Sequence, residues 1–125
     1  MEAIPFEVDL GLSTVQGILR LEQQHVAIDW RRYDLLGAPQ GELDTVTIPY
    51  AEIDDITFRK RLGGATIILS TKQATSLSRF PLPQGDINAL RASIKRTNRS
   101  NAEVWAAEAT LRIAEAEEPD QIEER

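Results

Sequence analysis

The chain of 125 residues contains no cysteine and only one histidine, His25. These absences exclude disulfide bonds, thiolate metal sites, thiol catalysis and metal sites built from several histidines. No apolar run approaches the roughly 20 residues that cross a bilayer, and no basic-then-apolar leader opens the chain. We therefore expect a soluble, cytoplasmic protein that holds no metal and no cofactor.

The composition indicates one folded domain with an acidic extension. At 42% hydrophobic and 27% charged residues, a chain of this length can bury roughly two thirds of its unfolded surface. The net charge of −6 is uneven, because residues 1–99 hold twelve acids and twelve bases, whereas residues 100–125 hold eight acids and two bases. We place a boundary there, between a folded domain over 1–99 and an acidic helical C-terminal extension over 100–125.

Apolar and polar residues alternate through most of the first 83 residues, which is the period of a half-buried β-strand. The uneven spacing at Asp54 and Asp55 indicates a β-bulge, and Gly63-Gly64 predicts a tight hairpin. The alternation predicts strands over residues 6–10, 14–22, 25–33, 46–50, 53–58, 65–69 and 77–82.

After Pro83 the apolar spacing changes to that of a helix. Ile87, Leu90 and Ile94 fall at i, i+3 and i+7, which places them on one helical stripe. A curled antiparallel sheet leaves one end open, and we expect this helix to close it.

This order of elements resembles the pleckstrin-homology-like (PH-like) fold, in particular the bacterial PH-like domains, over about residues 5–98. The resemblance also rests on the Gly63-Gly64 hairpin and on the segment Ile48–Ile56, which reads IPYAEIDDI. The expected fold is mainly β (α+β): a seven-stranded antiparallel curled sheet or barrel capped by a C-terminal helix, plus an extra tail helix.

The resemblance implies a binding module and not an enzyme. Members of the family bind phosphoinositides, peptides or partner proteins, and some bacterial members assemble into rings or filaments. Lipid-binding members carry a Lys/Arg cluster in the first loop between strands. Here neither residues 11–14 nor Gln23-Gln24 contain a basic residue, so no family lipid ligand is carried over.

The residues that could support chemistry have simpler interpretations. His25 is the only ordinary general base near neutral pH, but it has no nucleophile or paired carboxylate nearby in sequence. Glu52, Asp54 and Asp55 form an acidic cluster, yet alternate strand residues point to opposite faces, which disperses potential metal ligands. We therefore expect neither a catalytic residue nor a metal site.

The densest basic run, Arg59-Lys60-Arg61, precedes the Gly63-Gly64 hairpin. On a hairpin tip these three side chains could contact phosphates or anionic lipid. They also protect exposed strand edges against aggregation, and we favour that interpretation. A peripheral anionic lipid- or phosphate-binding domain that uses this hairpin is kept as the alternative function.

The extension predicts a helix over residues 101–118, with fraying after 118, because it is rich in Ala, Glu and Leu. Its apolar face includes the candidate partner-binding residues Val104, Trp105, Leu111 and Ile113. This face packs either on the chain's own barrel or on another chain. The expected function is a non-catalytic binding or scaffold module that acts through protein–protein contacts, including self-association through this helix. We expect a protein partner or a second copy and no nucleic acid, and membrane contact is disfavoured because the helix is acidic.

Overall fold

The computed structural model describes residues 3–83 and 85–117. Helix α1 (Arg99–Glu117) is the last element. Three short 3-10 turns are also present: η1 (Tyr50–Glu52) and η2 (Ala74–Leu77) lie between strands, and η3 (Arg96–Asn98) joins the last strand to α1. The strands are β1 (Ala3–Asp9), β2 (Ser13–Leu21), β3 (His25–Asp34), β4 (Pro39–Pro49), β5 (Ile53–Arg61), β6 (Gly64–Thr71) and β7 (Ala89–Lys95).

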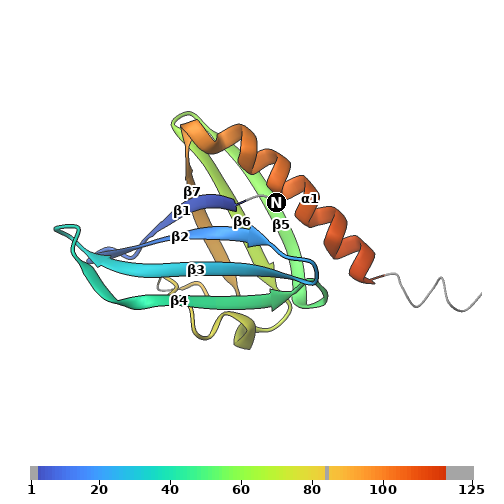
Figure 1. Cartoon of the computed structure of the whole chain (residues 1–125), viewed down its shortest axis with the longest axis horizontal. Helices are drawn as coiled ribbons and strands as arrows, with labels where there is room; N and C mark the ends of the chain where they lie inside the picture. The colour runs from blue at the N-terminus through green and yellow to red at the C-terminus, as the bar shows by residue number, and fades with distance from the viewer. Residues whose placement is uncertain (1–2, 84, 118–125) are drawn as a thin grey trace, which may run out of the picture.

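The seven strands form one antiparallel sheet in the order β4-β3-β2-β1-β7-β6-β5. β1 pairs with β2 along its whole length but with β7 only at Glu7 and Ser93. The sheet curls there, so that the β1–β4 half and the β5–β7 half cross at a steep angle (Figure 1). A mainly β fold with seven antiparallel strands in one curled sheet and a C-terminal helix is confirmed.

The concave side of the sheet holds the hydrophobic core. Alternate residues of each strand are buried there, as the period of two predicts. Gly17 of β2 lies between its neighbours on β1 and β3, and a Cβ at Gly17 would meet the Asp29 carbonyl oxygen and lie 2.8 Å from a Phe6 ring carbon. Phe80 covers this position, since its ring centroid lies 6.2 Å from that of Phe6 and 5.5 Å from that of Trp30.

The helix expected after Pro83 is wrong, because residues 89–95 form the inner strand β7. Leu90, Ala92 and Ile94 are buried at alternate positions, whereas Ile87 lies before the strand and is 68% exposed. The spacing of Leu90 and Ile94 fits a helix and a strand equally well, and pairing with β6 decides between them. The structure therefore has one α-helix in its described residues and not two.

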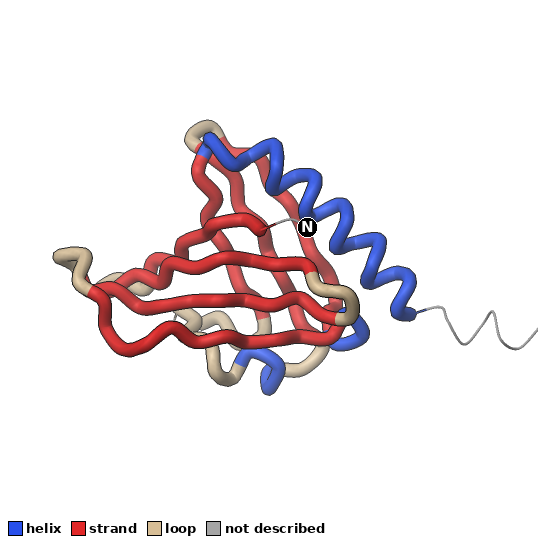
Figure 2. Tube along the Cα trace, in the orientation of Figure 1, coloured by secondary structure: helices blue, strands red, loops and turns tan. Residues whose placement is uncertain are grey.

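The strand expected over residues 77–82 is also wrong. Leu77 ends η2, and Phe80 lies in the loop that follows, drawn in tan in Figure 2. Both side chains are buried. Their apolar spacing therefore reflects packing of a loop against the core and does not indicate a strand. The bulge at Asp54 and Asp55 is confirmed by the register shift between β5 and β6. The fraying expected after residue 118 lies outside the described residues.

Helix α1 begins where β7 and η3 end and crosses the open side of the curled sheet (Figure 1). It packs on β5, β6, β1, β7 and η1. Its buried residues recur at helical spacing along one face: Ala102, Trp105, Ala106, Ala109 and Ile113. The alanines allow close approach of the helix to the sheet, and Trp105 is the largest side chain on this face.

Trp105→Ala is expected to lower the free energy of unfolding by about 3–5 kcal/mol, because it leaves a large cavity between α1 and the sheet. The exposed Leu111 provides a matched control on the same helix, and Leu111→Ala should change stability by less than about 0.5 kcal/mol. Urea unfolding followed by circular dichroism measures both. Equal losses for the two variants would contradict this packing.

Candidate functional site

The four residues predicted to bind a partner lie on two sides of α1. Trp105 is 0% and Ile113 7% exposed, and both pack on the chain's own sheet. Val104 and Leu111 are 59% and 60% exposed. A partner can therefore reach Val104 and Leu111 but not the other two.

Val104 and Leu111 belong to an exposed apolar line that also includes Ala107 and Ala114. The spacings of three, four and three residues are those of the positions through which one helix packs against another. This line, which we call the outer stripe, lies on the side of α1 opposite the buried face. No other described element covers it.

Carboxylates flank the outer stripe on both sides. Glu103 lies along one flank, and Glu108 and Glu115 lie along the other, at the positions that face a partner's charges in paired helices. Glu108 accepts a hydrogen bond from Arg112 Nε at 3.0 Å. Within residues 3–83 and 85–117, Glu103 and Glu115 make no salt bridge.

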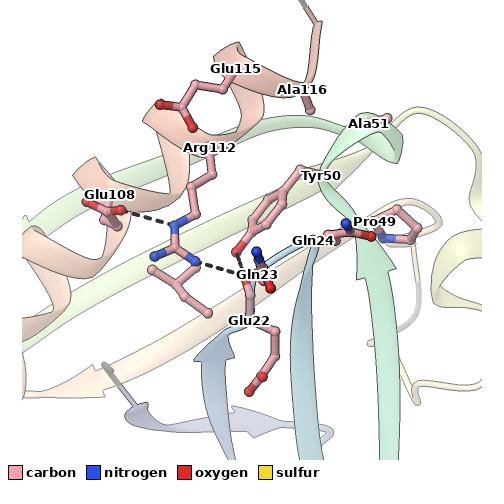
Figure 3. Close-up of a pocket in the computed structure, with 11 residues that line it drawn as sticks. Glu22, Gln23, Gln24, Pro49, Tyr50, Ala51, Glu108, Arg112, Glu115 and Ala116 are labelled. Carbon is pink, nitrogen blue, oxygen red and sulfur yellow. Dashed lines mark hydrogen bonds and ion pairs between the residues drawn. The ribbon is translucent and has the colours of Figure 1, made fainter. Parts of the chain in front are cut away.

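A surface pocket of about 890 Å³ adjoins the C-terminal half of α1. It lies between α1, η1 and the turn that joins β2 to β3 (Figure 3). Three carboxylates, those of Glu22, Glu108 and Glu115, line the pocket together with one base, Arg112. The pocket therefore extends the acidic character of the α1 flank towards the sheet.

Tyr50 and Arg112 join this part of α1 to the sheet (Figure 3). The Tyr50 hydroxyl donates to the Glu22 carbonyl oxygen at 2.7 Å, and Arg112 Nη1 donates to the same oxygen at 2.8 Å. Burial raises the pKa of the Tyr50 hydroxyl above its ordinary value, although Arg112 opposes the change. The Tyr50 hydroxyl and Glu108 in turn hold the pKa of Arg112 above its ordinary range. These bonds satisfy the groups locally, so we interpret them as a structural joint.

A cluster of opposite charge lies at the other end of α1. The β5–β6 hairpin carries Arg59, Lys60 and Arg61 next to the place where β7 ends and α1 begins (Figure 1). The register places Arg61 opposite Gly64, and Gly64 opposite Lys95. We call the resulting cluster the basic pole; its members are Arg59, Lys60, Arg61, Lys95, Arg96 and Arg99.

Acidic side chains of the described residues do not neutralise the positive charges of the basic pole. Arg99 Nη1 donates to the Arg61 carbonyl oxygen at 2.7 Å, which ties the start of α1 to the hairpin. No residue of the pole makes a salt bridge within the described part of the chain. Leu62, at the hairpin tip, is 95% exposed. The pole therefore combines unpaired cations with a protruding apolar side chain.

The sequence interpretation missed three members of the pole. Lys95 ends β7, and Arg96 and Arg99 follow it, whereas the sequence pattern predicted a helix in this segment. A usable signal was present, because residues 56–102 contain nine Lys and Arg residues and a single acid, Asp86. Folding that segment into β5, β6 and β7 concentrates much of its charge.

The remaining candidate residues lie apart from one another. His25 begins β3, and its side chain makes no hydrogen bond to another described residue. Glu52 accepts a hydrogen bond from Ser76 Oγ at 3.1 Å, and Asp55 accepts one from Thr57 Oγ1 at 2.8 Å. In the described residues no three His, Asp or Glu side chains are placed to share a metal ion. No helix of that part is long and apolar enough to cross a membrane.

The chain matches no protein-family model, no curated protein and no solved structure at a significant level. We therefore infer function from the two charged surfaces themselves.

Tyr50→Phe tests the joint. It should lower the free energy of unfolding at neutral pH by about 1 kcal/mol, because one buried hydrogen bond is lost. Since the pKa of Tyr50 is raised in the folded protein from an ordinary value of 10.0, its stabilising effect is complete below that value and is lost as the pH rises through the folded pKa. The variant should therefore lose less stability than the wild type above about pH 10.

Urea unfolding between neutral and alkaline pH measures the difference. Tyr33→Phe is the matched control, because Tyr33 is the only other tyrosine and its hydroxyl donates no hydrogen bond within the described residues. Identical pH profiles for Tyr50→Phe and Tyr33→Phe would rule out the joint.

Proposed function

We propose that this protein is a non-catalytic PH-like binding module that acts through protein contacts at the outer stripe of α1. The observation that carries the proposal is the exposure of Val104 and Leu111 opposite a fully buried face. Exposed apolar residues that share one helix face, with polar residues at its rim, are typical of surfaces that bind a partner. A cytoplasmic location belongs to the same proposal.

The PH-like part of the proposal is supported by the strand order and by the position of α1. Four strands in succession form one half of the sheet, three form the other, and the C-terminal helix crosses the opening. Fold alone does not determine activity, so the outer stripe carries the functional argument.

The non-catalytic part is supported by the distribution of reactive groups. Catalysis requires a nucleophile or base that is oriented by hydrogen-bonded partners. His25 has no such partner among the described residues. In the pocket beside α1, Tyr50 and Arg112 bond to the backbone of Glu22, and these bonds position α1.

Replacing Val104 and Leu111 by Gln should remove binding and preserve the fold, because both side chains are exposed. The full-length wild type and this stripe variant would be used as baits, and retained proteins would be quantified by mass spectrometry. The control bait carries Leu36→Gln and Leu43→Gln, which change two leucines that are 95% and 67% exposed outside α1. Partners should be lost from the stripe variant alone. Equal retention by all three baits would refute the proposal.

A second candidate function, favoured by the unpaired cations, is binding of anionic lipid or phosphate at the basic pole. The fixed cations of the pole and the exposed Leu62 suit the headgroups and the upper acyl region of a membrane. The negative charges of α1 lie mostly away from this end. The whole chain can therefore carry a charge of −6 and still present one positive surface.

The pole variant Arg59→Gln/Lys60→Gln/Arg61→Gln tests this candidate by co-sedimentation with phosphatidylcholine vesicles that do or do not contain phosphatidylserine. Wild type should bind only the anionic vesicles at low salt, and the variant should bind on the order of 100-fold more weakly. A dispersed variant with the same net charge is the control and should bind like wild type; it carries Arg31→Gln, Lys72→Gln and Arg79→Gln. Absence of wild-type binding at low salt would exclude this function.

A further inference from the structure

The molecule carries two uncovered surfaces of complementary chemistry. The basic pole surrounds Leu62, which is 95% exposed, with cations that make no salt bridge in the described residues. The outer stripe presents Val104 and Leu111, which are 59% and 60% exposed, between flanking carboxylates. Each surface has an apolar centre and a charged rim, and the two rims have opposite signs.

We propose that the basic pole of one copy docks on the outer stripe of a second copy. This inference rests on the proposed function, because it uses the same stripe, and it identifies the partner as another molecule of this chain. Leu62 would contact the apolar line between Val104 and Leu111. The cations of the hairpin would then face Glu103 on one flank and Glu115 on the other.

The charges favour this arrangement over the pairing of two α1 helices. Glu103, Glu108 and Glu115 flank the stripe of every copy, so two stripes placed face to face bring carboxylates together in either helix direction. Of these three, only Glu108 makes a salt bridge in the described residues, with Arg112. The pole supplies the cations that a second stripe lacks.

The two surfaces occupy different parts of the molecule, so one copy can use both. The outer stripe begins at Val104, about 7.5 Å along the helix axis after Arg99, and reaches Leu111 about 18 Å after it. Contact between two different surfaces is a heterologous interface, and it extends into a chain of copies unless the rotation closes a ring. A hairpin tip on one helix face is also a small interface, so we expect weak association that depends on concentration and on salt.

The pole is less suited to nucleic acid. Its cations are accompanied by Leu62, and none of its residues is aromatic. Single-stranded nucleic acids are bound by aromatic side chains on which bases stack, and a protruding aliphatic side chain has no partner on a phosphate backbone. An apolar stripe rimmed by carboxylates matches both features of the pole.

Light scattering after size-exclusion chromatography tests the proposal on full-length protein. The mass of the wild type should rise with concentration at low salt and return to that of one chain at about 1 M salt, where charges are screened beyond about 3 Å. The pole variant and the stripe variant should each remain monomeric, with dissociation constants raised roughly ten-fold or more. The dispersed variant, with the same net charge as the pole variant, should associate like the wild type.

The decisive measurement is an equal mixture of the pole variant and the stripe variant. The first keeps an intact stripe and the second an intact pole, so the mixture can form only one productive contact. It should therefore give a particle of two chains and nothing larger, whereas the wild type continues to grow. Circular dichroism and thermal unfolding check that every variant is folded.

The remaining outcomes separate the alternatives. A pole variant that still self-associates would overturn the proposal in favour of stripe-to-stripe pairing, and a mixture that stays monomeric would also overturn it. A wild type that is monomeric at every concentration would exclude self-docking. If the wild type is monomeric but the stripe variant alone loses its partners in the bait experiment, the proposed function stands. If the wild type is monomeric and the stripe variant keeps its partners, the proposed function fails as well.

Discussion

The burial of one face of α1 against the curled sheet is the contact on which the other features depend. Trp105 fills the open side of the sheet, and the small residues around it let the helix lie close to the strands. This contact fixes the rotation of α1 about its axis. It therefore determines that Val104 and Leu111 face outward, that Arg99 meets the β5–β6 hairpin, and that Arg112 reaches the Glu22 carbonyl oxygen.

The charges of α1 oppose its macrodipole. The first turn contains no acid and the last described turn no base, whereas cations of the pole gather at its start and glutamates towards its end. Each charge placed this way costs roughly 0.3–1 kcal/mol at an exposed terminus, and burial of the Trp105 face offsets the cost. Helix stability therefore does not explain this polarity.

Local alternation was sufficient to predict most of the sheet, because each strand has one buried face. The prediction failed where the same apolar spacing suits both a helix and a strand. Leu90 and Ile94 are four residues apart, which suits a helix, but Ala92 between them is also buried in β7. A small apolar residue weakens the period-two signal, and pairing with β6 decides the structure. The strand predicted from Leu77 and Phe80 was wrong for another reason, because loop residues that cover a core are also apolar.

The candidate surfaces were predictable only in part. The sequence indicated an apolar helix, but apolar residues occur on both sides of α1, so only the position of the sheet separates Trp105 and Ile113 from Val104 and Leu111. The basic pole depends on strand register, which brings Lys95 beside a hairpin more than 30 residues earlier in the chain. Val104 and Leu111 contribute nothing to the face of α1 that packs on the sheet. The proposed docking would give this second apolar line a role, because the basic pole at the start of the same helix carries cations that make no salt bridge in the described residues.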